Sequence, residues 1–182
     1  IEPGGDGALL RIKGSNSGLA ISTDCNSKFC YLDPYVGSSI AVAEACRNVS
    51  VTGAYPLAIT NGLNFGNPEK NDIKFQINES VRGISSAAKH FKIPVVSGNV
   101  SLYNETDGRS IFPTPIIGVI GLIDDVKKHS TISFKNKGDL IYVIGTPVPY
   151  DELIESDLVL PEPDITLEEA EELFTGEGIM PG

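Results

Sequence analysis

Hydrophobic and polar positions change their spacing several times along the chain, and these changes predict strands and helices in turn. Short apolar runs typical of strands occupy residues 8–13, 19–23, 56–60, 93–96 and 114–123. The first two runs are separated only by the polar, glycine-containing segment 14–18, which predicts a β-hairpin. The last run contains Gly118 and Gly121, which permit a bend or the close approach of another segment.

Two other segments carry apolar or small residues at helical spacing. Residues 35–49 follow Asp33 and Pro34, and a proline suits the opening turn of a helix. Residues 71–91 place apolar side chains three or four positions apart, which predicts an amphipathic helix. Because strands alternate with helices, the pattern predicts an α/β (α+β) fold in which helices pack on one or both faces of a sheet.

The composition changes near Asp124, which predicts a domain boundary. Residues 124–128 form a charged connector, and residues 138–145 are typical of the opening strand of a second domain. The remainder is strongly acidic, and residues 166–169 resemble a capping box ahead of a short helix that ends near Phe174. We therefore expect a first domain over 1–124, a connector with an opening strand over 125–150, and an acidic tail over 151–182.

Charge and cysteine content narrow the class of protein. The 24 acidic and 14 basic residues give a net charge of −10, which would repel a phosphate backbone, so a nucleic-acid partner is not expected. Cys25, Cys30 and Cys46 are odd in number and lack paired spacing, so they indicate neither a disulfide framework nor a zinc site. No apolar stretch predicts a membrane span or a signal peptide. These features favour a cytoplasmic protein without a membrane partner.

The first residues also bear on the extent of the chain. Residues 1–3 lack an initiator methionine and lead directly into a strand pattern. We therefore expect the sequence to begin inside a longer protein.

The first candidate for chemistry is the polar segment 60–69, which we expect to leave a buried strand as a loop. Ligands gather at the carboxyl ends of strands in open α/β sheets. The three asparagines and two glycines of this segment offer amide donors, carbonyl acceptors and backbone N–H groups to a nucleotide. The same residue types are the usual turn formers, so an ordinary turn is the alternative interpretation.

The second candidate is the segment 97–104, which follows the next predicted strand. Gly98 permits the backbone to approach a phosphate closely, and the side-chain oxygen of Asn99 is a hard ligand of the kind that Mg²⁺ accepts. The chain contains neither a GxxxxGK[ST] nor a GxGxxG motif. An ATP site would therefore have to use a less common architecture.

Other polar and reactive residues have no plausible catalytic setting. His90 lies near a helix end and His129 closes a charged connector, where partly exposed histidines are usually only solvated. Cys25 has no neighbouring histidine in the sequence and is interpreted as a small hydrophobic residue. The acidic run 168–172 is interpreted as a solvated helix face.

Taken together, several segments resemble the formylglycinamide ribonucleotide amidotransferase family, specifically the second synthetase-like half of its short, multi-subunit form. The resemblance covers roughly residues 1–145 and keeps the family's order. The matching strings are PGGD at 3–6, STDCN at 22–26, YLDPY at 31–35, PLAITN at 56–61, LNFGNPE at 63–69 and SGNVSLYN at 97–104.

The resemblance implies a fold shared with aminoimidazole ribonucleotide synthetase, with a β-rich face that pairs with an equivalent domain. It also implies an ATP-dependent C–N ligase of purine biosynthesis, in which ATP activates an amide oxygen of formylglycinamide ribonucleotide and ammonia then displaces phosphate. By position, Asn61 and Gly98 would contact ATP, Asn99 would ligate Mg²⁺ and Ser101 would touch the substrate. Many relatives carry Asp at position 61, where Asn keeps the hydrogen bonding but not the charge.

The resemblance further implies partners that this chain lacks. The family's catalytic histidine motif belongs to a preceding synthetase half, and the ammonia comes from a glutaminase subunit joined through a small bridging subunit. We therefore expect the isolated chain to be inactive. Beyond about residue 147 the sequence departs from the family pattern.

Two alternative functions remain open. The chain could be a non-catalytic nucleotide-binding and dimerisation half of the same fold, although a substrate contact at Ser101 favours the ligase. It could also belong to a related small-molecule kinase such as thiamine monophosphate kinase, against which the strings at 63–69 and 97–104 count.

Overall fold

A computed structural model describes residues 4–142 and 145. The chain divides into two units, residues 1–135 and 136–182, and each is described by itself. All helices and strands of the described residues belong to the first unit. In the second unit, residues 138–142 form a turn followed by irregular chain. The remainder of the predicted strand over 138–145, apart from Gly145, and the predicted helix after Thr166 lie outside the described residues.

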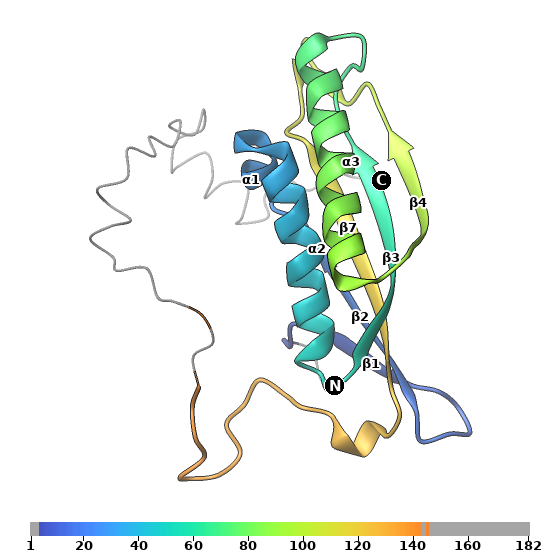
Figure 1. The fold of residues 1–182 in the computed structure, drawn as a ribbon, viewed down its shortest axis with the longest axis vertical. Coiled ribbons are helices and arrows are strands. Elements are labelled where there is room, and N and C mark those ends of the chain that lie inside the picture. Colours follow the sequence, from blue (N-terminus) through green and yellow to red (C-terminus); the bar gives the residue numbers. More distant parts are fainter. Residues whose placement is uncertain (1–3, 143–144, 146–182) are drawn as a thin grey trace, which may run out of the picture. The chain divides into compact units, whose positions relative to one another are not determined.

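Five strands of the first unit form one mixed sheet. They are β1 (Ala8–Arg11), β2 (Gly18–Asp24), β3 (Tyr55–Asn64), β4 (Val95–Ser101) and β7 (Thr114–Ile123). Their order is β1-β2-β7-β3-β4, so β4 lies at one edge (Figure 1). β3 and β4 are parallel, and each other neighbouring pair is antiparallel. The antiparallel pairing of β1 with β2 confirms the predicted hairpin.

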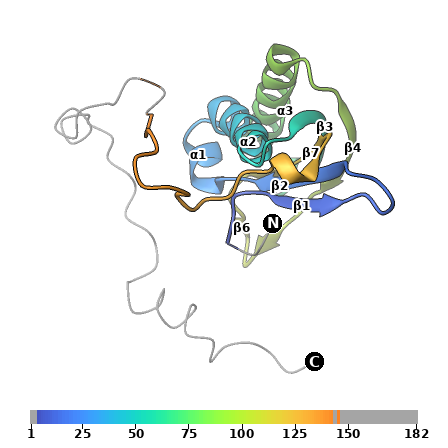
Figure 2. The same cartoon turned by 90° about the horizontal axis from the view of Figure 1, so that it is seen from below.

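Three helices pack on the same face of this sheet (Figure 2). They are α1 (Ser27–Leu32), α2 (Pro34–Ser50) and α3 (Asn71–Phe91), and the two long ones confirm the predicted helices. The Asp33 side chain accepts the Val36 backbone N–H at 2.9 Å, while Pro34 occupies the first turn of α2. The sequence did not predict α1, because six residues capped by the Asn26 side chain are too few to show a helical period.

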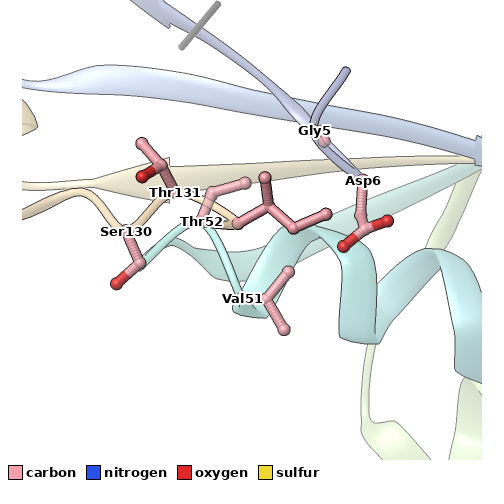
Figure 3. A pocket seen from close by; sticks show the side chains of 8 residues that line it. Gly5, Asp6, Val51, Thr52, Ser130 and Thr131 are labelled. Carbon is pink, nitrogen blue, oxygen red and sulfur yellow. The ribbon is translucent and has the colours of Figure 1, made fainter. Parts of the chain in front are cut away.

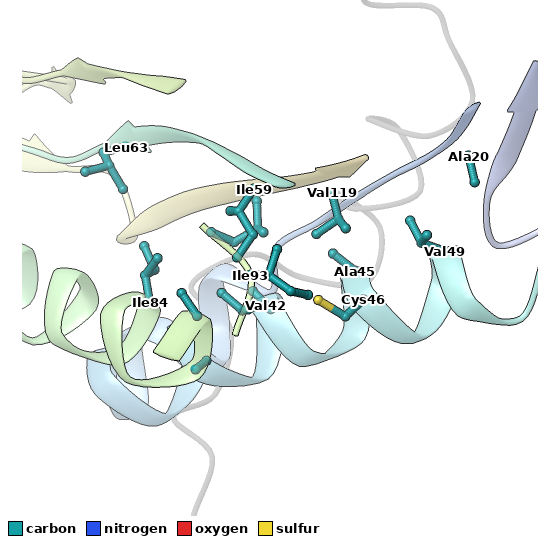
Figure 4. Close-up of a cluster of buried hydrophobic side chains, with 14 of the residues drawn as sticks. Ala20, Val42, Ala45, Cys46, Val49, Ile59, Leu63, Ile84, Ile93 and Val119 are labelled. Carbon is teal, nitrogen blue, oxygen red and sulfur yellow. The ribbon is translucent and has the colours of Figure 1, made fainter. Parts of the chain in front are cut away.

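The core lies between the helices and the sheet. Every second residue of β7 from Pro115 to Ile123 is buried there, including Ile117 and Val119, whereas β3 contributes Ile59 and Leu63. Val42 and Val49 of α2 meet them from the helix side, as Figure 4 shows for a part of this cluster. The alternation of buried and exposed positions in β2 and β7 follows from the two-residue period of a strand.

The opposite face of the sheet carries no helix of the first unit's described residues. Leu19, Ile116 and Ile120 point to this side and are each exposed over more than a third of their surface. We call it the open face. A sheet face that is apolar but uncovered is typical of a surface that associates with another layer.

Two features differ from the sequence-based prediction. Residues 61–64 were expected in a loop but continue β3, and residues 97–101 continue β4 instead of leaving it. The polar side chains do not end these strands, because β3 keeps its backbone pairing with β7 on one side and with β4 on the other as far as Asn64. The apolar pattern therefore marked only the first half of each strand.

Beyond the sheet, the first unit contains a two-stranded ribbon and a short 3-10 helix. β5 (Glu105–Thr106) and β6 (Arg109–Ser110) form a separate antiparallel ribbon directly after β4. The short helix η1 (Val126–Lys128) follows β7 and begins the charged connector.

Candidate functional site

The four candidate residues lie on two adjacent parallel strands. In the register of β3 and β4, Asn61 faces Gly98 across the pair, and the next positions bring Gly62 opposite Asn99. Ser101 ends β4 and lies opposite Asn64. We call residues 61–64 together with 98–101 the β3–β4 edge. Paired residues that are 37 positions apart in the sequence thus form one strip, which is polar except for Leu63 and Val100.

The β3–β4 edge presents its polar groups on both faces of the sheet. Asn61 shares the helix-covered face with Gly98, since its partner on β7 is the fully buried Ile117. A Cβ atom on Gly98 would clash with the Asn61 side chain and lie 2.8 Å from the Asn61 backbone oxygen. Asn99 instead occupies the open face, where its side-chain oxygen lies 3.3 Å from the Cβ position of Gly62.

These contacts give the two glycines different roles. At Gly98 any side chain would have to displace the Asn61 amide or the backbone of β3, so this position requires glycine. Gly62 leaves space beside the Asn99 oxygen and could take a small side chain with a slight shift. The absence of side chains at both positions keeps the backbone of the edge open to a ligand.

The segments that follow β3 and β4 are hydrogen-bonded to each other. Phe65 donates its backbone N–H to Ser101 at 3.0 Å, and Tyr103 donates to Gly66 at 2.9 Å. Phe65 is fully buried and closes the core beneath this junction. The strings LNFGNPE and SGNVSLYN, which are remote in the sequence, therefore form one structural unit.

A carboxylate that sequence reasoning missed anchors this unit. Glu105 Oε1 accepts hydrogen bonds from Lys70 Nζ at 2.7 Å, Ser110 Oγ at 2.7 Å and the Asn67 backbone N–H at 3.2 Å. The hydrogen bonds from Lys70 and Ser110 hold the pKa of Glu105 below its ordinary value. Its partners lie 5 to 38 positions away, and no sequence motif indicates such a network.

The β3–β4 edge offers few oxygen donors to Mg²⁺. Asn99 has one neutral side-chain oxygen on the open face, and no group of three or more His, Cys, Asp or Glu side chains that could hold a metal ion gathers within the described residues. Mg²⁺ commonly keeps several waters and binds through few protein oxygens together with substrate phosphates. The residues present therefore fit an ion that is shared with nucleotide phosphates, and they do not form a closed protein cage.

The sequence matches two known protein families. Residues 4–123, about two thirds of the chain, match the family described as AIR synthase related protein, N-terminal domain. The chain belongs to this family. Residues 123–182 match a second family, described as PspA-Associated protein, which meets the first match at residue 123.

The chain has curated relatives of high identity. It is 56% identical over 145 residues to the phosphoribosylformylglycinamidine synthase subunit PurL of Caldanaerobacter subterraneus subsp. tengcongensis. It is 54% identical over 145 residues to the same subunit of Thermoanaerobacter sp. (strain X514). Each match covers 80% of this chain and 20% of the relative, so the chain spans about a fifth of the length of these proteins.

Solved structures show the same fold. Thermotoga maritima PurL complexed with ATP is 34% identical with a TM-score of 0.65, over 70% of this chain and 21% of that one. The PurLQS structure from T. maritima is 33% identical with a TM-score of 0.68, over 73% of this chain and 22% of that one. AaThiL complexed with AMPPCP and TMP is 19% identical with a TM-score of 0.53, covers 66% of this chain and 37% of that one, and shares the fold alone.

The hollows of the AIR synthase related domain lie elsewhere. The one in Figure 3 has a volume of about 70 Å³, and Asp6, Thr52 and Ser130 contribute to its wall. Two wider hollows of about 350 and 390 Å³ border α2 and α3. None of these three contains a residue of the β3–β4 edge. Residues 98–100 of the edge are exposed, whereas Leu63 is buried.

The histidines and cysteines of the domain have no catalytic arrangement. His90 and His129 are exposed, and His129 Nδ1 contacts the backbone oxygen of Val126. The cysteines are free thiols, with Cys30 and Cys46 buried. A hydrogen bond with the Cys30 thiol, together with burial, raises the pKa of Cys25, which keeps it protonated and a poor nucleophile. No helix in the described residues is long and apolar enough to cross a membrane.

Proposed function

We propose that this chain is the ATP- and substrate-contacting AIR synthase related domain of a phosphoribosylformylglycinamidine synthase, an ATP-dependent C–N ligase of purine biosynthesis. The observation that carries the proposal is the register of β3 with β4, which pairs Asn61 with Gly98 and places Asn99 and Ser101 one and three positions further along β4. The 56% identity to a PurL subunit supports the assignment. We also propose that the first domain ends near residue 124, in keeping with the family match to residue 123.

The residues of the edge are assigned separate roles, since Asn61 and Gly98 share the helix-covered face and Asn99 and Ser101 share the open face. Gly98 leaves its backbone accessible to ATP, while the amide of Asn61 beside it forms hydrogen bonds to the nucleotide. Asn99 supplies one oxygen to Mg²⁺, which when bound neutralises charge on the ATP phosphates. Ser101, on the same face as Asn99, contacts formylglycinamide ribonucleotide.

In this reaction the domain orients the reactants. ATP activates the amide oxygen of formylglycinamide ribonucleotide, and ammonia then displaces phosphate to give the amidine. Holding nucleotide and substrate on one rigid strand pair lowers the entropic part of the barrier. The described residues contain no histidine at the edge, so proton transfer is assigned to a separate synthetase half.

The proposal includes partners that complete the enzyme. Solved relatives include T. maritima PurL complexed with ATP, the same protein complexed with FGAR, and PurLQS from T. maritima. We propose that this chain acts with a preceding synthetase half, a glutaminase subunit and a small bridging subunit, in the cytoplasm. The apolar open face is the surface offered to an equivalent sheet.

A second candidate is a non-catalytic half that binds nucleotide only for structure and dimerises through the open face. The uncovered side chains Leu19, Ile116 and Ile120 favour it, since they suit association without chemistry. The two functions differ at Ser101, which a purely structural site does not need. Substitution of Ser101 therefore separates them.

The proposal can be tested by segment exchange. In Caldanaerobacter PurL, the 145 matching residues are replaced by those of this chain, and synthesis of the amidine is measured with ATP, formylglycinamide ribonucleotide and ammonia. We expect an active exchange enzyme that loses activity with Ser101→Ala, and no product from the isolated chain. A folded but inactive exchange enzyme, or one indifferent to Ser101→Ala, contradicts the proposal. The unmodified parent synthase is the control.

A further inference from the structure

The side-chain amide of Asn104 lies against the Ser101 hydroxyl. Asn104 Oδ1 is 3.3 Å from Ser101 Oγ, and Asn104 Nδ2 is 3.2 Å from the same oxygen. The Nδ2 group also donates to the backbone oxygens of Phe65 and Ser101, each at 3.0 Å. Asn104 thus touches both the candidate substrate residue and the segment that follows β3.

The two carbonyl oxygens fix which way the amide points. If the amide were turned over, its oxygen would face the oxygens of Phe65 and Ser101, which offer no proton. Nδ2 must therefore face the carbonyls, and Oδ1 must lie on the remaining side, within reach of the Ser101 hydroxyl. Because a serine hydroxyl has one proton, a bond from Ser101 Oγ to Oδ1 uses that proton.

We propose that Asn104 is a positioning residue that determines whether Ser101 donates or accepts a hydrogen bond with the ligand. Its Oδ1 accepts the hydrogen bond that the Ser101 hydroxyl donates, so Ser101 presents a lone pair to the ligand and selects a hydrogen-bond donor. On formylglycinamide ribonucleotide the donors are the amide N–H groups and the ribose hydroxyls, whereas an ionised phosphate offers only acceptors. This inference rests on the proposed function, in which Ser101 contacts the substrate.

The backbone around Asn104 keeps the amide in place. Asn104 donates its own N–H to Phe65 at 3.1 Å and accepts the N–H of Ile111 at 3.0 Å. Tyr103, directly before it, adopts the left-handed conformation with φ of 61°, which turns the chain back toward Ser101. The side chain is also half-buried, which limits competition from water.

The positioning is tested first on the chain itself by NMR. If Asn104 bonds as described, its side-chain amide protons exchange with solvent at least tenfold more slowly than those of the exposed Asn78. Ser101→Ala should shift the Asn104 side-chain resonances and leave those of Asn78 unchanged. Equal exchange rates for the two amides, or no shift at Asn104, overturns the inference whatever the enzyme does.

The consequence for the ligand is tested in the exchange enzyme by a double-mutant cycle. We expect Ser101→Ala and Asn104→Ala each to raise KM for formylglycinamide ribonucleotide roughly tenfold, and the double variant to match Ser101→Ala. Thr52→Val is the control, because it removes a buried hydroxyl bond to Val49 at the opposite end of β3. It should lower Tm without changing KM.

The outcomes separate the two claims. If Ser101→Ala leaves KM unchanged, the substrate contact of the proposed function fails and the inference falls with it. If Ser101→Ala raises KM but Asn104→Ala does not, or if the two effects multiply, the inference alone is wrong. Substrate analogues that lack one ribose hydroxyl or carry an N-methyl amide test whether Ser101 accepts a hydrogen bond from the substrate. One of these analogues should bind more weakly than the substrate to the parent enzyme, but not to Asn104→Ala. Equal losses in both overturn the lone-pair assignment.

Discussion

The centre of the sheet and the β3–β4 edge are built on different principles. In the centre, Ile59, Ile117 and Val119 are fully buried under the helices, and stability comes from apolar packing. At the edge, most β4 side chains are exposed, and hydrogen bonds and glycine-permitted contacts hold the strands. One sheet therefore carries a packed core and an exposed polar strip on adjoining strands, so substitutions can alter stability and function separately.

The largest effect on the free energy of unfolding should come from a substitution in the buried centre of the sheet. Ile117 is 0% exposed and Ile116, its neighbour on the other face, is 42% exposed. Ile117→Ala should lower the free energy of unfolding by about 2–5 kcal/mol, because a cavity remains under the helices. Ile116→Ala should lower it by less than about 1 kcal/mol on the isolated chain. Urea unfolding of both variants measures the difference, and equal losses would contradict the assignment of the two faces.

The next largest effect on stability should come from the close contact between Gly98 and Asn61 at the β3–β4 edge. Gly98→Ala forces a Cβ atom against Asn61, so we expect a loss of about 1–3 kcal/mol of stability. Gly62→Ala is the matched control on the neighbouring strand, since its nearest contact is 3.3 Å. It should cost clearly less. If both substitutions are equally tolerated in thermal unfolding, β3 and β4 are not as close as described.

The central elements could be predicted from the sequence, and the edge could not. The bounds of α3 match the predicted 71–91, and β7 matches 114–123, because burial imposes a period on each. The continuation of β3 through Asn61 could not be predicted, since polar residues at a strand end resemble a loop. The resemblance to a family supplied Asn61, Gly98, Asn99 and Ser101 as candidates, but their register came only from the structure.

The supporting residues of the edge escaped prediction for a related reason. Asn104 and Glu105 act through partners such as Phe65 and Lys70, which lie 39 and 35 positions away. Hydrogen bonds across such separations leave no periodic signal in one sequence. Only the folded chain shows that these residues join the two candidate segments.

A smaller effect should appear at acid pH. The hydrogen bonds from Lys70 and Ser110 lower the pKa of Glu105 in the folded chain, so its contribution is present above the unfolded value and lost as pH falls through the folded one. Stability should therefore decline below about pH 4.3, the ordinary glutamate value. Glu105→Gln should flatten that decline, with Glu79→Gln as the control on α3. Parallel stability curves for parent and Glu105→Gln would contradict the network.

The smallest effect should come from Tyr103, which holds a left-handed backbone with φ of 61° although its side chain is largely exposed. Tyr103→Gly removes the strain of that conformation and little packing, so stability should stay within about 1 kcal/mol of the parent or rise. Tyr103→Val should destabilise, because a β-branched residue tolerates this φ poorly. Calorimetric melting of the two variants gives the comparison, and a more stable valine variant would argue against the turn.

The measurement that most directly tests the central claim is the Mg²⁺ dependence of turnover in the exchange enzyme with Asn99→Ala. If Asn99 ligates the ion beside ATP, kcat/KM should fall roughly tenfold to a thousandfold, about 1.4–4 kcal/mol of transition-state stabilisation. Part of the loss should return at raised Mg²⁺, while thermal stability changes little, since Asn99 is exposed on the edge strand. Superimposable Mg²⁺ curves for Asn99→Ala and the parent would contradict a metal site at the β3–β4 edge.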